Sequence, residues 1–175
     1  MSGKTIIVYK SSTGFTRRYA QMIAEKTGAQ LLDLKETKAI KLRGADTIVF
    51  GGRLRAGSID GLKKARALYE KSGASRFVVF ATGAAPNEAR ETIEETWRKN
   101  LNPSELETVP HFYMQAGLCY EKMGFVDRSM MKMLGRMLAA RKNKTPQDEA
   151  LEKMLEKSFD ISDESFILPL LEYLK

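Results

Sequence analysis

The chain has 175 residues, of which 43% are hydrophobic and 29% are charged, a composition typical of a soluble globular protein with a sizeable core. Its 29 Lys and Arg residues outnumber its 22 Asp and Glu residues, and the net charge of +7 favours anionic partners. A single cysteine, Cys119, and a single histidine, His111, exclude an internal disulfide and a multi-cysteine metal cage, so no metal site is expected.

The first predicted elements are a strand over about residues 5–9 and a helix over about residues 15–26. The run from Ile6 to Tyr9 is apolar and β-branched, as in a strand that is buried on both faces. The apolar residues after Thr16 have helical spacing, and Gly28 is placed to end that helix.

The turn between these two elements, Ser11 to Gly14, consists of small hydroxyl residues and a glycine. Where a strand leads through such a loop into a helix, free backbone N–H groups and the positive end of the helix dipole point at one spot. The hydroxyl groups add donors there, and Gly14 lets a ligand approach the backbone closely. We therefore expect an oxyanion, most simply a phosphate, to bind at this turn.

Two further strands and a helix are predicted in the next segment. The strands cover about residues 30–34 and 45–50, and the second strand ends at a Gly-Gly pair. A loop over residues 53–57 follows, and Ser58 is the candidate N-cap of a helix that continues to about residue 71.

The pattern then repeats with a strand over residues 76–81, a loop over residues 82–86, a helix capped by Asn87, and a strand over residues 111–118. Apolar strands that alternate with helices predict a parallel sheet with helices on both faces. Ligands bind such sheets at the carboxyl ends of the strands. Three glycine-containing loops fall there, after the first, third and fourth strands, which places a candidate ligand site at that edge.

After Tyr120 the pattern changes to helices of opposite charge. The first, over residues 125–141, is amphipathic, and residues 121–144 carry seven basic and two acidic residues. Its apolar stripe consists of Val126, Met130, Met133, Leu134, Met137 and Leu138, and its cationic stripe of Arg128, Lys132 and Arg136. Three further elements are expected to close the chain: an acidic helix over residues 147–157, an edge strand over residues 158–161, and a helix over residues 163–174 with a kink at Pro169.

The segment Ser11-Ser12-Thr13-Gly14-Phe15-Thr16 is similar to the phosphate-loop pattern (S/T)-x-T-G-x-T of flavodoxins, and it lies between the first strand and the first helix, as that family requires. With the succession of five strands, the resemblance covers residues 1–118. The segments Met114–Tyr120 and Phe125–Met133 resemble the region after the fifth strand in the menaquinone-dependent protoporphyrinogen oxidase branch of this superfamily. The loop over residues 51–57 also looks like the loop of that branch.

The resemblance implies a flavodoxin-like, doubly wound α/β fold with a five-stranded parallel sheet in the order 2-1-3-4-5. It implies a single domain over residues 1–175, in which residues 121–158 form a helical appendage after the fifth strand. It also implies bound FMN, with the phosphate on the turn and the isoalloxazine ring between two loops. The implied cofactor-binding residues are Ser11, Ser12, Thr13, Gly14, Phe15 and Thr16 for the phosphate, and Arg53, Leu54, Arg55, Ala56, Thr82, Gly83, Ala84 and Ala85 for the ring.

Two functions follow from this resemblance, and the residues do not decide between them. In the first, the protein is an FMN-dependent oxidoreductase that passes electrons from a reduced substrate to a quinone or to a protein acceptor, as in protoporphyrinogen oxidase. In the second, it is an electron carrier between partner proteins. No side chain is identified as a catalytic acid or base, because the cofactor carries the chemistry. The cations Arg53 and Arg55 would favour the anionic reduced ring.

The Met-rich cationic stretch over residues 122–142 allows two interpretations. Either it packs on its own domain, or it docks on an anionic membrane through adaptable methionines and a cationic face. No apolar run is long enough to span a membrane, and the N-terminus lacks a signal peptide's apolar segment, so we expect a cytoplasmic protein. In the second interpretation it is peripheral at the inner face of the membrane. Nucleic acid is not an expected partner, because the basic residues here alternate with methionines instead of aromatic residues.

Overall fold

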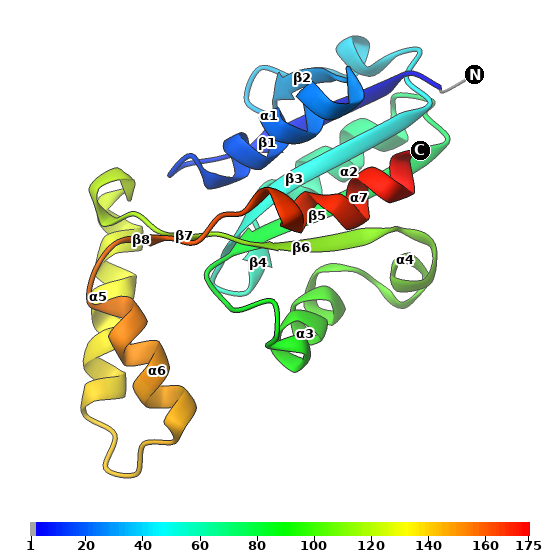
Figure 1. The fold of residues 1–175 in the computed structure, drawn as a ribbon. Coiled ribbons are helices and arrows are strands. Elements are labelled where there is room, and N and C mark those ends of the chain that lie inside the picture. The colour runs from blue at the N-terminus through cyan, green and yellow to red at the C-terminus, as the bar shows by residue number, and fades with distance from the viewer. Residues whose placement is uncertain (1–2) are drawn as a thin grey trace. The chain divides into compact units, whose positions relative to one another are not determined.

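The computed structural model describes residues 3–175, apart from the side chain of residue 147. The chain forms two compact units, a main unit of residues 1–116 and 162–175 and a helical unit of residues 117–161. Figure 1 shows the helices and strands of both units. The expectation that residues 1–175 form a single domain stays a prediction.

The main unit is built on a sheet of five parallel strands. These are β1 (Thr5–Lys10), β2 (Gln30–Asp33), β3 (Thr47–Arg55), β5 (Arg76–Gly83) and β6 (His111–Gln115). Their order is β2-β1-β3-β5-β6, which confirms the predicted order 2-1-3-4-5. The three central strands consist almost entirely of buried residues, because helices cover both faces of the sheet.

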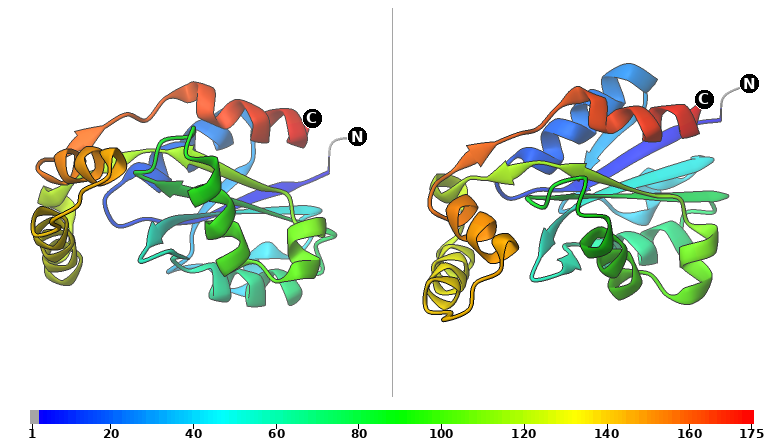
Figure 2. Two further views of the ribbon diagram at one scale, coloured as in Figure 1. Left: turned by 90° about the horizontal axis from the view of Figure 1, so that it is seen from below. Right: turned by 60° about the horizontal axis from the view of Figure 1, so that its bottom comes forward.

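Helices form a layer on each face of the sheet (Figure 2). On one face lie α1 (Phe15–Thr27) and α7 (Leu168–Leu174), and on the other lie α2 (Leu62–Glu70), α3 (Arg90–Asn100) and α4 (Pro103–Thr108). Short 3-10 turns cover Ala39–Leu42 and Glu164–Ile167. The predicted first helix is confirmed, and Gly28 ends it with a φ of 69°, a left-handed conformation that suits glycine.

The side chains of successive residues in each strand point to opposite faces of the sheet. Leu62, Ala65 and Trp97 pack in one cluster with strand residues that include Ile6, Val8, Ile48, Phe50, Phe77 and Val79. The intervening residues Ile7, Val49, Val78 and Phe80 are also fully buried and by alternation face α1 and α7. The central strands are therefore buried without interruption, because their alternate residues pack into two separate cores.

The prediction that the third strand ends before the Gly-Gly pair is wrong, because β3 continues through both glycines to Arg55. A Cβ at Gly51 would collide with the ring of Phe80 on the neighbouring strand. Glycine in a strand costs roughly 0.5–1 kcal/mol relative to alanine. Burying a phenylalanine side chain contributes roughly 1.5–3 kcal/mol. Gly51 is therefore a packing residue in the sheet and not the start of a loop.

Two predicted helix caps are also wrong. Ser58 belongs to a short strand, β4 (Ser58–Ile59), that pairs antiparallel with β3, and α2 begins only after Gly61, which has a φ of 89°. Asn87 lies within a turn, and α3 begins at Arg90 without a side-chain cap. Both errors place a helix start too early, because a polar residue that follows a strand resembles a cap in sequence even where the helix begins further along the chain.

Helix α4 was not predicted, although its sequence carries a start motif. Asn102 accepts a hydrogen bond from the backbone of Glu105, and the Glu105 side chain accepts one from the backbone of Asn102. Pro103 occupies the first turn, where its missing N–H needs no partner. The pattern Asn-Pro-x-Glu is the capping-box signature and could have been found from the sequence.

The C-terminal segment differs from the predicted kinked helix. The chain makes the 3-10 turn and then starts α7, so Pro169 falls in the first turn of a helix instead of its interior. The predicted strand over residues 111–118 is divided in two. Its first part is β6, and its last two residues form β7 (Gly117–Leu118) in the helical unit.

The helical unit contains α5 (Phe125–Ala139) and α6 (Pro146–Leu155), which lie side by side (Figure 1). It also contains a 3-10 turn (Tyr120–Lys122) and the strand pair β7 and β8 (Phe159–Asp160). Thr145 and Asp148 form a capping box at the start of α6. Two ion pairs, Arg141–Asp148 at 2.7 Å and Lys144–Glu152 at 2.6 Å, join α6 to the loop before it. No helix among the described residues is both long enough and apolar enough to cross a bilayer.

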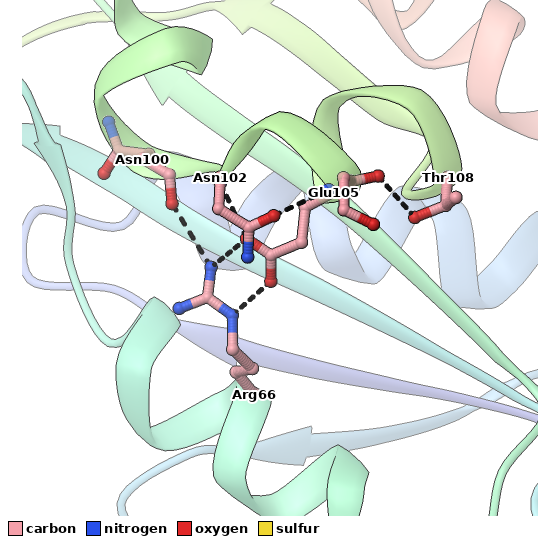
Figure 3. Close-up of polar contacts among 6 residues, drawn as sticks. Arg66, Asn100, Asn102, Glu105 and Thr108 are labelled. Carbon is pink, nitrogen blue, oxygen red and sulfur yellow. Dashed lines mark hydrogen bonds and ion pairs between the residues drawn. The ribbon is translucent and has the colours of Figure 1, made fainter.

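Arg66 on α2 connects α2 to the ends of α3 and α4 (Figure 3). Its guanidinium donates to the two carboxylate oxygens of Glu105, at 2.6 and 3.0 Å, and to the carbonyl of Asn100 at 3.2 Å. The Arg66 and Glu105 side chains are only 29% and 17% exposed, so solvent screens this bidentate pair less than an ordinary surface ion pair.

Replacing Arg66 with Met keeps the aliphatic stem and removes the guanidinium, which leaves a half-buried carboxylate. We expect R66M to lower the free energy of unfolding by about 2 kcal/mol. The matched control is R98M, because Arg98 pairs with Glu94 on the surface of α3 with both side chains more than half exposed. That change should cost less than about 0.5 kcal/mol. Urea denaturation measures both variants, and equal losses would contradict the assigned role of Arg66.

Candidate functional site

The predicted site residues lie at the carboxyl edge of the sheet, where β1, β3 and β5 are neighbours. Lys10 on β1 is paired with Gly52 on β3, and Arg53 on β3 is paired with Thr82 on β5. The segments 11–16, 53–56 and 82–85 therefore meet at one edge, as expected from the alternation of strands and helices. Residues 53–55 and 82–83 belong to the strands themselves and not to loops.

The turn before α1 has the geometry of an anion site. Ser11 Oγ accepts a hydrogen bond from the N–H of Gly14 at 3.1 Å, and Gly14 has a φ of 102°. The first helical hydrogen bond runs from the N–H of Arg18 to the carbonyl of Gly14 at 3.0 Å. The N–H groups of residues 15–17 thus precede the first bond of the helix and have no acceptor within it. A Cβ at Gly14 would meet no atom within 4 Å, so this side of the turn is open.

Two of the six residues expected at the phosphate have structural roles. Phe15 is buried at 9% exposure, and Thr16 is buried at 1% exposure. The Thr16 hydroxyl forms a hydrogen bond of 2.8 Å with the hydroxyl of Thr82 at the end of β5. This bond ties the start of α1 to β5. Ser12 is exposed and Thr13 half-buried, so their hydroxyls are the side-chain donors most open to a ligand.

Beyond Arg53, β3 turns back into β4 through Ala56 and Gly57. Both residues have positive φ, 49° and 75°, which is the pattern of a type I′ turn. An alanine in this conformation is strained, so the turn depends on contacts from elsewhere. Helix α3 supplies them: Lys99 Nζ donates to the carbonyl of Ala56 at 3.1 Å, and the Asn100 side chain binds the turn and β4.

Asn100 uses both ends of its amide on this hairpin. Its Nδ2 donates to the carbonyl of Gly57 at 2.9 Å, and its Oδ1 accepts from the N–H of Ile59 at 2.8 Å. The same Nδ2 also donates to the carbonyl of Thr96 within α3. Sequence reasoning missed Asn100, because nothing in the local sequence indicates a partner more than forty residues away.

The cations of the site share one carboxylate. The Asp60 carboxylate accepts a hydrogen bond from Lys10 Nζ at 2.7 Å and lies 3.6 Å from Arg53 Nε. All three side chains are no more than one third exposed. Asp60 therefore balances part of the positive charge of Lys10 and Arg53. Arg55, two residues further along β3, is exposed. The net charge of these four side chains is positive.

The end of β5 rests on β6. The Tyr113 hydroxyl donates to the carbonyl of Ala85 at 2.9 Å, and the N–H of Ala116 donates to the carbonyl of Gly83 at 2.8 Å. Burial raises the pKa of Tyr113, so its hydroxyl stays protonated and keeps this bond over the whole physiological range. A Cβ at Gly83 would lie 2.7 Å from the Tyr113 hydroxyl, which explains the glycine. Nearby, the buried Oδ1 of Asn87 has no hydrogen-bond partner among the described residues.

Other residues considered from the sequence have structural partners. His111 Nδ1 lies 2.8 Å from the carbonyl of Val109, and its ring contacts Trp97 at a centroid distance of 4.8 Å. Cys119 Sγ lies 3.4 Å from a carboxylate oxygen of Glu121. Among residues 3–175, apart from the side chain of residue 147, no group of three His, Cys, Asp or Glu residues is placed to hold a metal ion. Clefts of about 350 and 670 Å³ lie near Arg76 and Thr5, at the opposite edge of the sheet.

A family model described as a flavodoxin domain matches residues 6–145. A search of curated proteins found no match. Solved structures with a similar fold include a flavodoxin from the domain Archaea, 17% identical, covering 88% of this chain and 99% of that chain with a TM-score of 0.39. A flavodoxin, WrbA-like protein from Agrobacterium tumefaciens is 17% identical, covers 99% and 100%, and has a TM-score of 0.42. Oxidised Flavodoxin 2 from Bacillus cereus is 20% identical, covers 63% and 84%, and has a TM-score of 0.39.

Replacing Asn100 with Leu removes both hydrogen bonds to the hairpin at nearly constant volume. We expect N100L to lower the free energy of unfolding by about 2 kcal/mol, because the N–H of Ile59 and the carbonyl of Gly57 lose their partner. The amide of Ile59 should lose its protection from hydrogen exchange, while amides in the centre of β3 keep theirs. The matched control, N100D, retains an acceptor for Ile59 and should keep that amide protected. Full protection of Ile59 in N100L would contradict the assignment.

Proposed function

The chain belongs to the flavodoxin domain family, and on that premise we propose that it is an FMN-binding redox protein. The observation that carries the proposal is the open turn before α1, where unpaired N–H groups and hydroxyls converge beside the joined ends of β3 and β5. The proposed reaction is the passage of electrons from a reduced substrate to a quinone or a protein acceptor, as in protoporphyrinogen oxidase.

The residues at the turn fit a phosphate monoester. The N–H groups of residues 15–17 and the hydroxyls of Ser12 and Thr13 would hold it, with Ser11 keeping the turn closed and Gly14 providing the left-handed backbone. These donors are uncharged, and the helix dipole adds a positive potential at this point. Because Thr16 and Phe15 are buried, they would position the turn more than contact the phosphate with their side chains.

The flavin ring would lie between the hairpin, residues 53–56, and the end of β5, residues 82–85. Both segments are held by bonds that need no ligand, from Lys99 and Asn100 on one side and from Tyr113 on the other. The unpaired Oδ1 of Asn87 is an acceptor beside the second segment. Neither segment contains an aromatic residue, so main-chain and aliphatic contacts with Leu54, Ala84 and Ala85 would replace ring stacking.

Bound flavin supplies the one- and two-electron chemistry, and the protein supplies the charge around it. Arg53 and Lys10 are partly balanced by Asp60, and Arg55 is a further cation, at an exposed position of β3. A positive surrounding favours an anionic reduced ring, which suits an enzyme that exchanges electron pairs with a quinone. The alternative function, an electron carrier between proteins, is favoured by the exposure of Arg55 and Ala56 on the hairpin and requires separate single-electron steps.

The phosphate assignment predicts that the protein binds FMN at least about 100-fold more tightly than riboflavin, because two or more charge-assisted hydrogen bonds are lost without the phosphate. The double variant S12A/T13A should weaken FMN binding by at least about tenfold and leave riboflavin binding unchanged. Flavin fluorescence quenching measures both. The control S104A/T108A removes two exposed hydroxyls from α4 and should bind FMN normally. Equal affinities for FMN and riboflavin would refute the site.

The electrostatic assignment predicts that the FMN-loaded protein takes up two electrons in a single step, at a midpoint not far below that of free FMN. The variant R55Q should lower this midpoint by some tens of millivolts, because it removes a cation near the ring, whereas R43Q, an exposed arginine after the 3-10 turn Ala39–Leu42, should not. A stepwise anaerobic redox titration tests both. Two well-separated single-electron steps would favour the electron carrier over the oxidoreductase.

A further inference from the structure

Most of the apolar stripe of helix α5 is exposed, although an apolar stripe usually packs in a core. Phe125 is 86% exposed, Val126 and Met133 are both 59% exposed, and Met137 is 62% exposed. Met130 and Leu134, on the same stripe, are each 37% exposed. Of the predicted stripe only Leu138 is buried, and Leu155 on α6 is buried too, in line with the packing of these two helices against each other.

The exposed side of α5, called here the α5 face, consists of Phe125, Val126, Met130, Met133, Leu134 and Met137 with the bordering cations Lys132 and Arg136. At about 100° per residue, the apolar members from Val126 to Met137 share one side of the helix, and the two cations follow along one border. The third predicted cation, Arg128, does not belong to this face. It is half-buried and donates to the carbonyls of Tyr120 and Met123, at 2.6 and 3.3 Å.

The α5 face carries no exposed carboxylate. Asp127, the one acid of α5, is half-buried and has a partner. Two of the three acids of α6 have cations of their own, because Asp148 pairs with Arg141 and Glu152 pairs with Lys144. No ion pair among the described residues joins Lys132 or Arg136 to an acid, so both cations add their charge to the apolar face.

We propose that the α5 face docks on an anionic lipid surface. The apolar stripe from Phe125 to Met137 is about 18 Å long, which is too short to cross a bilayer but long enough for a helix that lies in the interface. Methionine and leucine side chains insert at the boundary between headgroups and acyl chains, and the two bordering cations pair with lipid phosphates.

Two other occupants fit the charges less well. A second copy of the chain would bring the same two cations close to their counterparts across a two-fold axis, where like charges repel. Nucleic acid would be held through its phosphates by cations, and it would leave six exposed apolar side chains without a favourable environment. An anionic bilayer satisfies both the apolar stripe and its cationic border.

The test uses the full chain in vesicle flotation, so it needs no bound flavin and does not depend on the proposed function. The protein is expected to float with vesicles of phosphatidylglycerol and phosphatidylcholine and to stay behind with vesicles of phosphatidylcholine alone. Added salt should weaken binding to the anionic vesicles, because the lipid charge acts only within a Debye length.

Two variants separate the parts of the face. K132E/R136E should lower partition into anionic vesicles by at least about 30-fold, since each cation near such a surface contributes about a fivefold factor. M133Q/M137Q should lower it by at least about tenfold, because two exposed apolar side chains no longer enter the interface. All four positions are exposed, so circular dichroism and urea unfolding should match those of the parent protein.

The matched control is K38E/K41E, which makes the same change in net charge at two exposed lysines of the main unit and should float like the parent. Equal losses in K132E/R136E and in this control would show a general charge effect and overturn the proposal. So would a parent protein that floats with neither vesicle, or a dimer in sedimentation that M133Q/M137Q dissociates while no vesicle binding occurs.

Discussion

The hydrogen bond between the hydroxyls of Thr16 and Thr82 is the contact on which the carboxyl edge of the sheet depends. Thr16 stands in the first turn of α1, Thr82 stands near the end of β5, and β3 lies between β1 and β5 in the sheet. Both residues are almost fully buried, so either hydroxyl left alone would cost about 1–3 kcal/mol. The start of α1 is thereby held at one place against the sheet.

At the carboxyl edge of the sheet, the neutral hydrogen-bond donors and the charged side chains lie on different segments. The turn before α1 offers N–H groups and hydroxyls to an anion and no charged side chain of its own. The charges belong to the neighbouring strands, where Asp60 balances part of the charge of Lys10 and Arg53. A phosphate can therefore be held by preorganised dipoles, while the cations of β3 act on whatever lies between the hairpin and β5. The rigid support for that second role comes from Asn100 and Tyr113, which need no ligand to keep their bonds.

In the helical unit, the apolar and charged residues of an amphipathic helix do not lie where its sequence pattern predicts. The predicted helix is present and amphipathic, but it turns its apolar stripe to solvent and buries a side that includes Arg128 and Leu138. The ion pairs at the start of α6 neutralise only two of the basic residues of this region, Arg141 and Lys144. Charge is left over where the apolar residues are exposed, on Lys132 and Arg136. A surface of this composition requires a partner that is both apolar and anionic, which is the basis of the proposed lipid contact.

The sequence by itself determined the succession of strands and helices, the parallel sheet and the turn before α1, because these depend on local periodicity, on apolar runs and on glycine at left-handed positions such as Gly28. The family resemblance supplied the strand order. The tertiary structure alone decided that Gly51 lies within a strand, since the reason is the ring of Phe80 on the next strand. It also decided that Asn100 supports the hairpin and that Thr16 faces Thr82, because these partners are 41 to 66 residues apart and no local pattern connects them.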